Sequence, residues 1–250
     1  MLKGHLENIT KYAGFNKLEC DKKLLVIVYT NSSIPKEVTD KIFAICKEYN
    51  ADPVVYKEPT TSFIDNLYAC WNLGYENALE GLVFRGGSDQ IFSKDSFVSL
   101  YNQRMSFQNK KVILQANTVE NSNRAVSSRH ILADLGGTFE SLDYVGFERL
   151  CDNLNSVTKT PLLSLQDSIN LWGKPTGFMS TLGPINRTDG CSWLMTRKDW
   201  EDHGPLPVME NGVTGDVVIH DRFQMDGYES YIVRDCITYH FIMGESKEIR

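Results

Sequence analysis

Short apolar runs alternate with amphipathic segments over the first 115 residues of the chain. The run Leu24–Tyr29 is rich in β-branched residues and predicts a strand that is buried on both faces. Apolar residues at helical spacing follow from Val38 to Tyr49, and Pro53–Tyr56 predicts a second strand. A strand, a helix and a strand in this order predict a right-handed crossover between parallel strands.

The same alternation then repeats. Ile64 to Ala78 shows one apolar helical face, Leu82–Phe84 predicts a third strand, and a helix through Phe97 precedes a fourth strand at Val112–Leu114. We therefore expect an α/β fold with a Rossmann-like, mixed but mostly parallel sheet that is flanked by helices. The chain offers no clear linker, so we expect residues 1–250 to form a single domain.

The second half of the chain is less regular. From Asn117 to Asp189 the sequence is rich in Ser, Thr, Asn and Gly, and it predicts functional loops with one helix near Tyr144–Leu154. Three further elements follow, which are a strand at Trp193–Met195, a helix at Asp216–Met225 and one or two closing strands within Tyr228–Phe241.

Charge, cysteine content and hydropathy indicate which partners and which cellular location to expect. The net charge of −6 disfavours a nucleic-acid partner, because phosphate-backbone binders are usually basic. The six cysteines are scattered, and we expect reduced, mostly buried thiols in a cytoplasmic protein. We also expect no transmembrane segment, because the longest apolar run is far shorter than a bilayer requires.

Three groups of polar residues are candidates for chemistry. Gly86–Asp89 follows the third strand, and a carboxylate there can hold a divalent cation beside a diphosphate. For this motif alone, a tight turn that caps the next segment is the stronger interpretation. Asp216 follows a glycine-rich loop and is a candidate general base or a helix cap. His240 lies in an alternating strand and is a candidate ligand or a core histidine.

The order of these groups resembles a known pattern. Asn72–Ala78 followed by Phe84–Asp89 is similar to N-x-G-x-x-x-A followed by F-L-x-x-D-D, a pattern of nucleotide-sugar-dependent glycosyltransferases of the GT-A fold, especially the large inverting family with many polysaccharide-building enzymes. Trp193–Trp200, His203–Leu206 and the later residues up to His240 follow the usual order of that family. The resemblance covers about residues 22–105 and 188–245.

The resemblance implies a GT-A-like (nucleotide-diphospho-sugar transferase) fold and a set of roles. Asp89 and His240 would bind a divalent cation, Mn²⁺ or Mg²⁺, and Asp216 would be the catalytic base. Residues 22–115 would bind the nucleotide sugar, and residues 116–250 would bind the acceptor and supply the base. The residues that would contact the donor are Thr30, Asn31, Arg85, Ser88, Asp89 and Arg222.

Three departures from the family pattern concern charged residues. Asp89 is the only carboxylate left in the acidic motif, Trp71 stands where an Arg often precedes the Asn, and Gly215 replaces the Glu before Asp216. A single carboxylate makes a weaker cation site. Arg85 could partly replace the missing positive charge, or it could be a surface residue at a strand end.

We therefore predict an inverting glycosyltransferase that moves a sugar from a UDP- or GDP-sugar to a glycan or another hydroxyl acceptor. The first alternative is a degenerate member that binds a nucleotide sugar or glycan without turnover. The second is a nucleotidyltransferase, but residues 30–34 contain neither the glycine nor the basic residue that its signature loop needs.

Overall fold

The computed structural model describes residues 1–30, 32–57, 63–108, 110–123, 131–172, 179–180, 183–184, 192–207, 209–210 and 213–242. The chain forms two compact units, and each unit is built from segments that are distant in sequence. We call Met1–Leu18, Gly86–Leu194 and Tyr228–Arg250 the sheet unit, and Glu19–Arg85 and Met195–Gly227 the crossover unit. The division of function between residues 22–115 and 116–250 stays a prediction.

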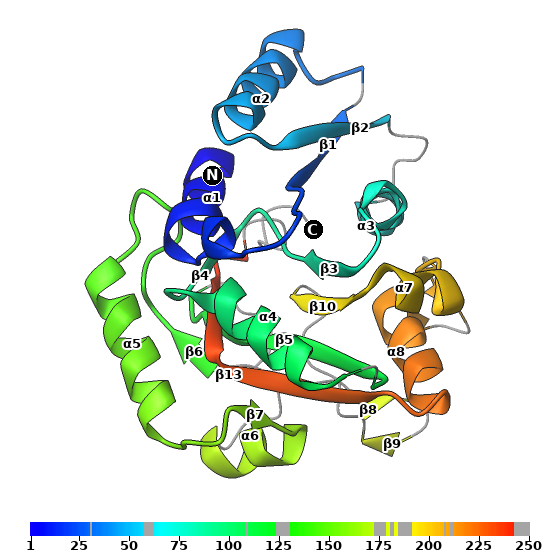
Figure 1. Cartoon of the computed structure of the whole chain (residues 1–250). Coiled ribbons are helices and arrows are strands. Elements are labelled where there is room, and N and C mark those ends of the chain that lie inside the picture. Colours follow the sequence, from blue (N-terminus) through cyan, green and yellow to red (C-terminus); the bar gives the residue numbers. More distant parts are fainter. Residues whose placement is uncertain are drawn as a thin grey trace. The chain divides into compact units, whose positions relative to one another are not determined.

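The crossover unit begins with the expected strand, helix and strand. β1 (Leu25–Thr30) pairs in parallel with β2 (Asp52–Lys57). The helices α2 (Lys36–Glu48) and α3 (Phe63–Asn77) lie on opposite sides of the two strands (Figure 1). The prediction of β1 as fully buried was wrong. Only Val28 is buried, because β1 and β2 form a two-stranded sheet in the described part of the chain.

Asn72 connects α3 to the later segment of the crossover unit. Its Oδ1 accepts hydrogen bonds from Leu206 N at 2.9 Å and Trp200 Nε1 at 3.3 Å, and its Nδ2 donates to Leu206 O at 3.0 Å. The motif residue Asn72 therefore has a structural role here. The remaining elements of this unit are β3 (Leu82–Arg85), α7 (Arg197–His203), β11 (Met209–Glu210), β12 (Val213–Thr214) and α8 (Gly215–Met225).

The sheet unit is organised around two long strands, β5 (Val112–Asn121) and β13 (Glu229–His240), which run in parallel. Antiparallel pairs join β4 and β7 to β13, and β10 to β5, whereas β6 joins β5 in parallel. The expectation of a mostly parallel sheet was wrong, because antiparallel pairings outnumber parallel ones here. The short strands are β4 (Gln90–Phe92), β6 (Ile131–Ala133), β7 (Leu162–Leu163) and β10 (Trp193–Thr196).

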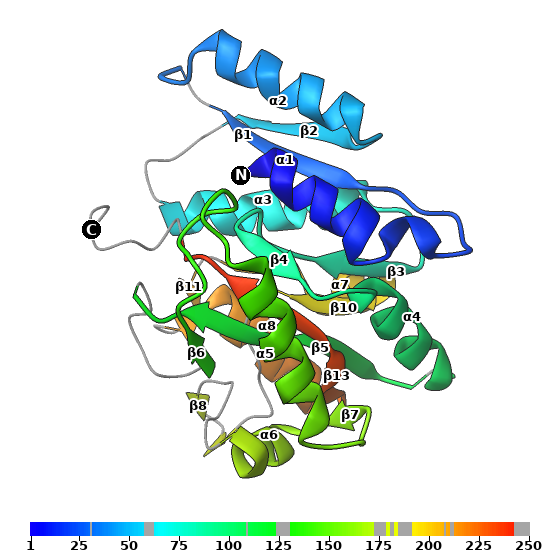
Figure 2. The ribbon, with the colours of Figure 1, turned by 90° about the vertical axis from the view of Figure 1, so that its left-hand side faces the viewer.

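Two helices cover the sheet of this unit. α5 (Tyr144–Ser156) packs Phe147 and Cys151 against Ile237 and Tyr239 of β13. α4 (Ser96–Ser106) lies over the other face, where Phe97 contacts Phe92 with ring centroids 5.3 Å apart (Figure 2). The further elements of this unit are α6 (Leu165–Trp172), β8 (Met179–Ser180) and β9 (Gly183–Pro184).

The N-terminal segment protects the edge strand β4. It consists of α1 (Leu2–Glu7), a π-helical turn (Asn8–Tyr12) and a short 3-10 turn (Phe15–Lys17), none of which we expected from the sequence. The side chain of the buried Asn8 makes the two hydrogen bonds to Phe92 that a neighbouring strand would otherwise make. Its Oδ1 accepts from Phe92 N at 2.8 Å, and its Nδ2 donates to Phe92 O at 3.0 Å. The N-terminal segment thereby fixes the strand that follows Asp89.

Asn8→Leu is expected to lower the free energy of unfolding by about 2–5 kcal/mol, because it leaves a buried N–H and a buried carbonyl of Phe92 unpaired. Urea denaturation measures this change. Asn77→Leu is the matched control, since Asn77 is exposed and its side-chain amide donates to Leu73 O of its own helix, so its effect should stay within about 0.5 kcal/mol. Equal stability of the two variants would contradict the role of Asn8.

The described cysteines and helices can be compared with the expectations of buried thiols and no membrane span. The five described cysteines are free, and Cys46, Cys151 and Cys236 are buried as expected, whereas Cys20 is exposed. Cys191 lies outside the described residues. Among the helices that the structure describes, none is both long and apolar enough to cross a membrane.

Candidate active site

The sheet unit brings Asp89 and His240 together. β4 and β13 pair with His240 opposite Gln90, so the last residue of β13 lies beside the residue that follows Asp89. His240 Nε2 lies 3.2 Å from Asp89 Oδ2, and Phe241 N donates to the carbonyl oxygen of Asp89 at 2.9 Å. The exposed fractions of the two side chains are 19% for Asp89 and 11% for His240. The two residues proposed as metal ligands are therefore direct neighbours.

The turn before Asp89 is held by Gln90. This fully buried side chain accepts a hydrogen bond from Gly87 N at 2.8 Å and donates one to Ser192 Oγ at 3.0 Å. A Cβ on Gly87 would lie 2.8 Å from Asp89 Oδ1, so a larger residue would require the Asp89 carboxylate to shift from this position. Ser88, a predicted donor-binding residue, is exposed on the same turn.

His5 supports the same turn from the N-terminal helix. Its Nδ1 lies 2.7 Å from the carbonyl oxygen of Gln90 and donates to it, because a carbonyl only accepts. Burial lowers the pKa of His5, while the bond to Gln90 and the charge of Asp89 act in the opposite direction. The His5 imidazole thus supports the turn that carries Asp89 by its bond to the Gln90 backbone.

The Asp89–His240 pair fits a divalent cation only in part. A carboxylate and an imidazole are suitable ligands, but among the described residues no group of three His, Cys, Asp or Glu side chains could hold a metal ion. The remaining coordination positions would require oxygens from a ligand or water. A diphosphate supplies such oxygens, which makes the pair more suitable for a metal–diphosphate complex than for a bare ion.

In the crossover unit, Asp216 is the second residue of α8. Tyr68 of α3 is buried, with 4% of its surface exposed, and its hydroxyl donates to Asp216 Oδ1 at 2.9 Å. Gly215 precedes Asp216 in very close packing, because a Cβ there would overlap the carbonyl oxygen of Pro207. Position 215 therefore has no room for the glutamate that the family pattern has there.

The buried side chain of Arg85 lies against Trp71, whose ring in turn contacts Tyr68. The guanidinium carbon of Arg85 is 3.8 Å from the centroid of the Trp71 ring, and the rings of Trp71 and Tyr68 are 5.3 Å apart. Arg85 is 7% exposed, so it is not the surface residue that a strand-end position allowed. Its charge lowers the pKa of the buried Tyr75, against the larger effect of burial, which raises it.

The end of β1 carries an aromatic pair that the sequence reasoning missed. Tyr29 and Tyr56 are directly opposite each other on β1 and β2, with ring centroids 6.3 Å apart. The buried Asn66 receives a hydrogen bond from the Tyr56 hydroxyl at 3.3 Å and donates one to the Tyr29 hydroxyl at 3.4 Å. Thr30 ends β1 next to this pair, and Asn31 lies outside the described residues.

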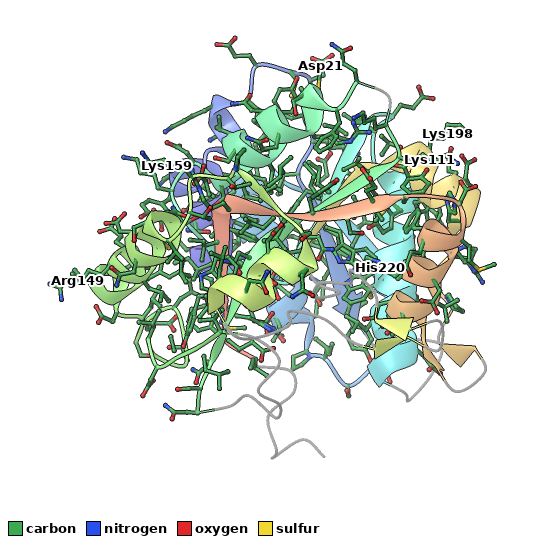
Figure 3. All side chains as sticks on the ribbon, turned by 90° about the horizontal axis from the view of Figure 1, so that it is seen from below. Asp21, Lys111, Arg149, Lys159, Lys198 and His220 are labelled. Atoms are coloured by element: carbon green, nitrogen blue, oxygen red, sulfur yellow. The ribbon has the colours of Figure 1, made fainter. Side chains whose placement is uncertain are left out.

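Arg222 makes a structural contact within the crossover unit. Its Nη1 donates to the carbonyl oxygen of His203 at 2.8 Å, at the end of α7. His220, on the same helix, is 2% exposed and points inward, in contrast to Lys198 on α7 (Figure 3). The predicted role of Arg222 in donor binding stays a prediction, and the contact that we observe joins α8 to α7.

Comparison with solved structures finds 33 similar chains. No protein-family model and no curated protein match the sequence. The chain is similar to the crystal structure of GalNAc-T7 with UDP, GalNAc and Mn²⁺, with 10% sequence identity and a TM-score of 0.48. The similarity covers 86% of this chain and 37% of that chain, so the chain spans much less than the full length of that protein. UDP, GalNAc and Mn²⁺ are ligands of that protein.

Proposed function

We propose that the chain is a glycosyltransferase that moves a sugar from a UDP- or GDP-sugar to a hydroxyl acceptor with inversion. The observation that carries the proposal is the contact between Asp89 and His240, two residues 151 positions apart that the motif order had assigned to one metal–diphosphate site.

The sheet unit would bind the cation. Asp89 and His240 would hold Mn²⁺ or Mg²⁺, which when bound supplies positive charge for the diphosphate leaving group. Gln90 keeps the turn in place, and Gly87 gives the carboxylate room. This assignment leaves coordination positions for the donor itself, so cation and nucleotide sugar would bind together.

The crossover unit would supply the remaining groups. Asp216 would take the proton of the acceptor hydroxyl while that oxygen attacks the anomeric carbon and the nucleoside diphosphate leaves. Arg85 would add positive charge that stabilises the departing diphosphate. Thr30 and the aromatic pair Tyr29 and Tyr56 would contact the nucleoside.

A non-catalytic binding protein is the second candidate, and the lone carboxylate Asp89 is the observation that favours it. Such a protein would bind a nucleotide sugar and release no diphosphate. A nucleotidyltransferase would instead consume a nucleoside triphosphate. Analysis of the released nucleotide after incubation with UDP-glucose, GDP-mannose or UTP separates these three functions.

Asp89→Ala is expected to weaken binding of the matching nucleotide sugar by at least about tenfold in the presence of Mn²⁺, because it removes one of two protein ligands of the cation. Isothermal titration calorimetry with UDP-glucose and GDP-mannose, with and without Mn²⁺, measures the change. Asp152→Ala removes an exposed carboxylate of the same unit and serves as the control. The melting temperature should stay close to that of the wild type in both variants.

Unchanged affinity of Asp89→Ala for every donor would exclude the proposed metal site. If Mn²⁺ has no effect on the wild type but Arg85→Ala abolishes donor binding, the diphosphate is held by protein charge alone. If no nucleotide sugar binds to the wild type at all, the proposed function is wrong.

A further inference from the structure

The buried hydroxyl of Tyr68 is bonded to the carboxylate that we assign as the base. We propose that Tyr68 is a positioning residue for Asp216, which fixes the orientation of the carboxylate by its hydrogen bond to Oδ1. The bond from Tyr68 to Oδ1 is 2.9 Å long, and Tyr68 is 4% exposed. This inference rests on the proposed function, because a positioning residue needs a reaction to serve.

Packing fixes where the Tyr68 hydroxyl lies. Tyr68, Trp71, Asn72 and Tyr75 follow the spacing i, i+3, i+4 and i+7, so they share one face of α3. Trp71 meets the Tyr68 ring edge to face at an interplanar angle of 68°. Further along the helix, Asn72 is bonded on both sides of its amide and Tyr75 stacks on Trp200 at 5.5 Å. The helix face is therefore fixed at three successive points.

The bond is suited to a base that must stay ionised. A phenol is a neutral donor at neutral pH, and a hydrogen bond to a carboxylate favours the ionised form. The position of Asp216 in the first turn of α8 adds the positive end of the helix dipole. Both effects favour the ionised carboxylate, which is the form that a base needs, and the Tyr68 bond also fixes its direction.

The competing explanation is structural, in which Asp216 only stabilises the first turn of α8 and Tyr68 only ties α3 to it. Tyr68→Phe separates the two explanations, because it removes the hydroxyl and keeps the ring against Trp71. Tyr75→Phe is the matched control. Tyr75 is on the same face of the same helix and is 2% exposed, and its hydroxyl has no hydrogen-bond partner in the described part of the chain.

We expect Tyr68→Phe to lower kcat by about 10- to 100-fold, because a hydrogen bond to a charged group is lost at the base. The dissociation constant of the donor should change by less than about twofold, and Tyr75→Phe should keep the wild-type kcat. The assay measures UDP or GDP released from UDP-glucose, UDP-N-acetylglucosamine or GDP-mannose. The donor used is the one that the wild type turns over fastest.

A second measurement tests the contact without any turnover. Urea midpoints of Tyr68→Phe, Asp216→Ala and the double variant form a cycle, and we expect their effects to be non-additive because each single variant removes the bond between the two side chains. Additive effects overturn the inference whatever the activity. Non-additive effects with a wild-type kcat in Tyr68→Phe also overturn it, because the contact is then only structural. A wild type that releases no diphosphate from any donor overturns the proposed function, and the inference falls with it.

Discussion

Asp216→Asn is expected to lower turnover by about 10²–10⁴-fold and to leave donor affinity nearly unchanged. An amide cannot take up the proton of an acceptor hydroxyl at neutral pH, whereas the aspartate can. Asparagine has nearly the same shape, can still cap a helix, and still offers the Tyr68 hydroxyl an acceptor oxygen. Stability should therefore change little, which separates the role of a base from the role of a cap.

The measurements for Asp216→Asn are kcat, the donor dissociation constant and the melting temperature. Asp202→Asn is a suitable control, because Asp202 is exposed on α7 and pairs with Lys198 of the same helix. Turnover at the wild-type level in Asp216→Asn would exclude Asp216 as the base. Asp221, which is half-buried later in α8, would be the next carboxylate to replace.

Periodic segments of the fold were predictable. The segments predicted as α2 and α3 show an apolar face at helical spacing, and α8 ends where Gly227 adopts a left-handed φ of 79°, as the Asp-Gly signal indicated. The parallel pairing of β1 and β2 followed from the crossover rule and is confirmed. Sheet direction was not predictable, because β4 and β7 have three and two residues and are too short to show alternation.

The candidate site was predictable only where a motif carried it. Motif order led to Asp89, His240 and Asp216, and the structure places the first two in contact. His5, Gln90 and the Tyr68 bond have no spacing that points to them, since each is a single polar group among buried neighbours. Their role follows from tertiary contacts, which a single sequence does not contain.

One departure from the family pattern has a physical counterpart in the structure. The pattern often has an Arg where this chain has Trp71, and here the guanidinium of Arg85 lies 3.8 Å from the Trp71 ring centroid. A cation over an aromatic face is stabilised by the ring electrons. The positive charge is thus present beside α3, although it comes from the end of β3.

Gly215, which stands where the family pattern has a glutamate, is the subject of the last prediction. Gly215→Ala is expected to lower the free energy of unfolding by at least about 3 kcal/mol, the upper part of the range for overpacking, because the added Cβ would overlap the carbonyl oxygen of Pro207. The overlap involves backbone rather than a flexible side chain, so α8 or the Pro207 segment must shift. Such a shift moves Asp216 away from Tyr68, and turnover should fall as well.

Gly74→Ala is the matched control for this variant. Gly74 lies inside α3, and its added Cβ would meet Ile27 at an ordinary 3.6 Å, so alanine should stabilise the helix by about 0.5–1 kcal/mol. Urea denaturation of both variants measures the contrast. Gly215→Glu, which restores the family residue, should be at least as harmful as Gly215→Ala because it carries the same Cβ. Wild-type stability and turnover in Gly215→Ala would show that the Pro207 segment yields freely, and that close packing at Gly215 does not hold Asp216 in place.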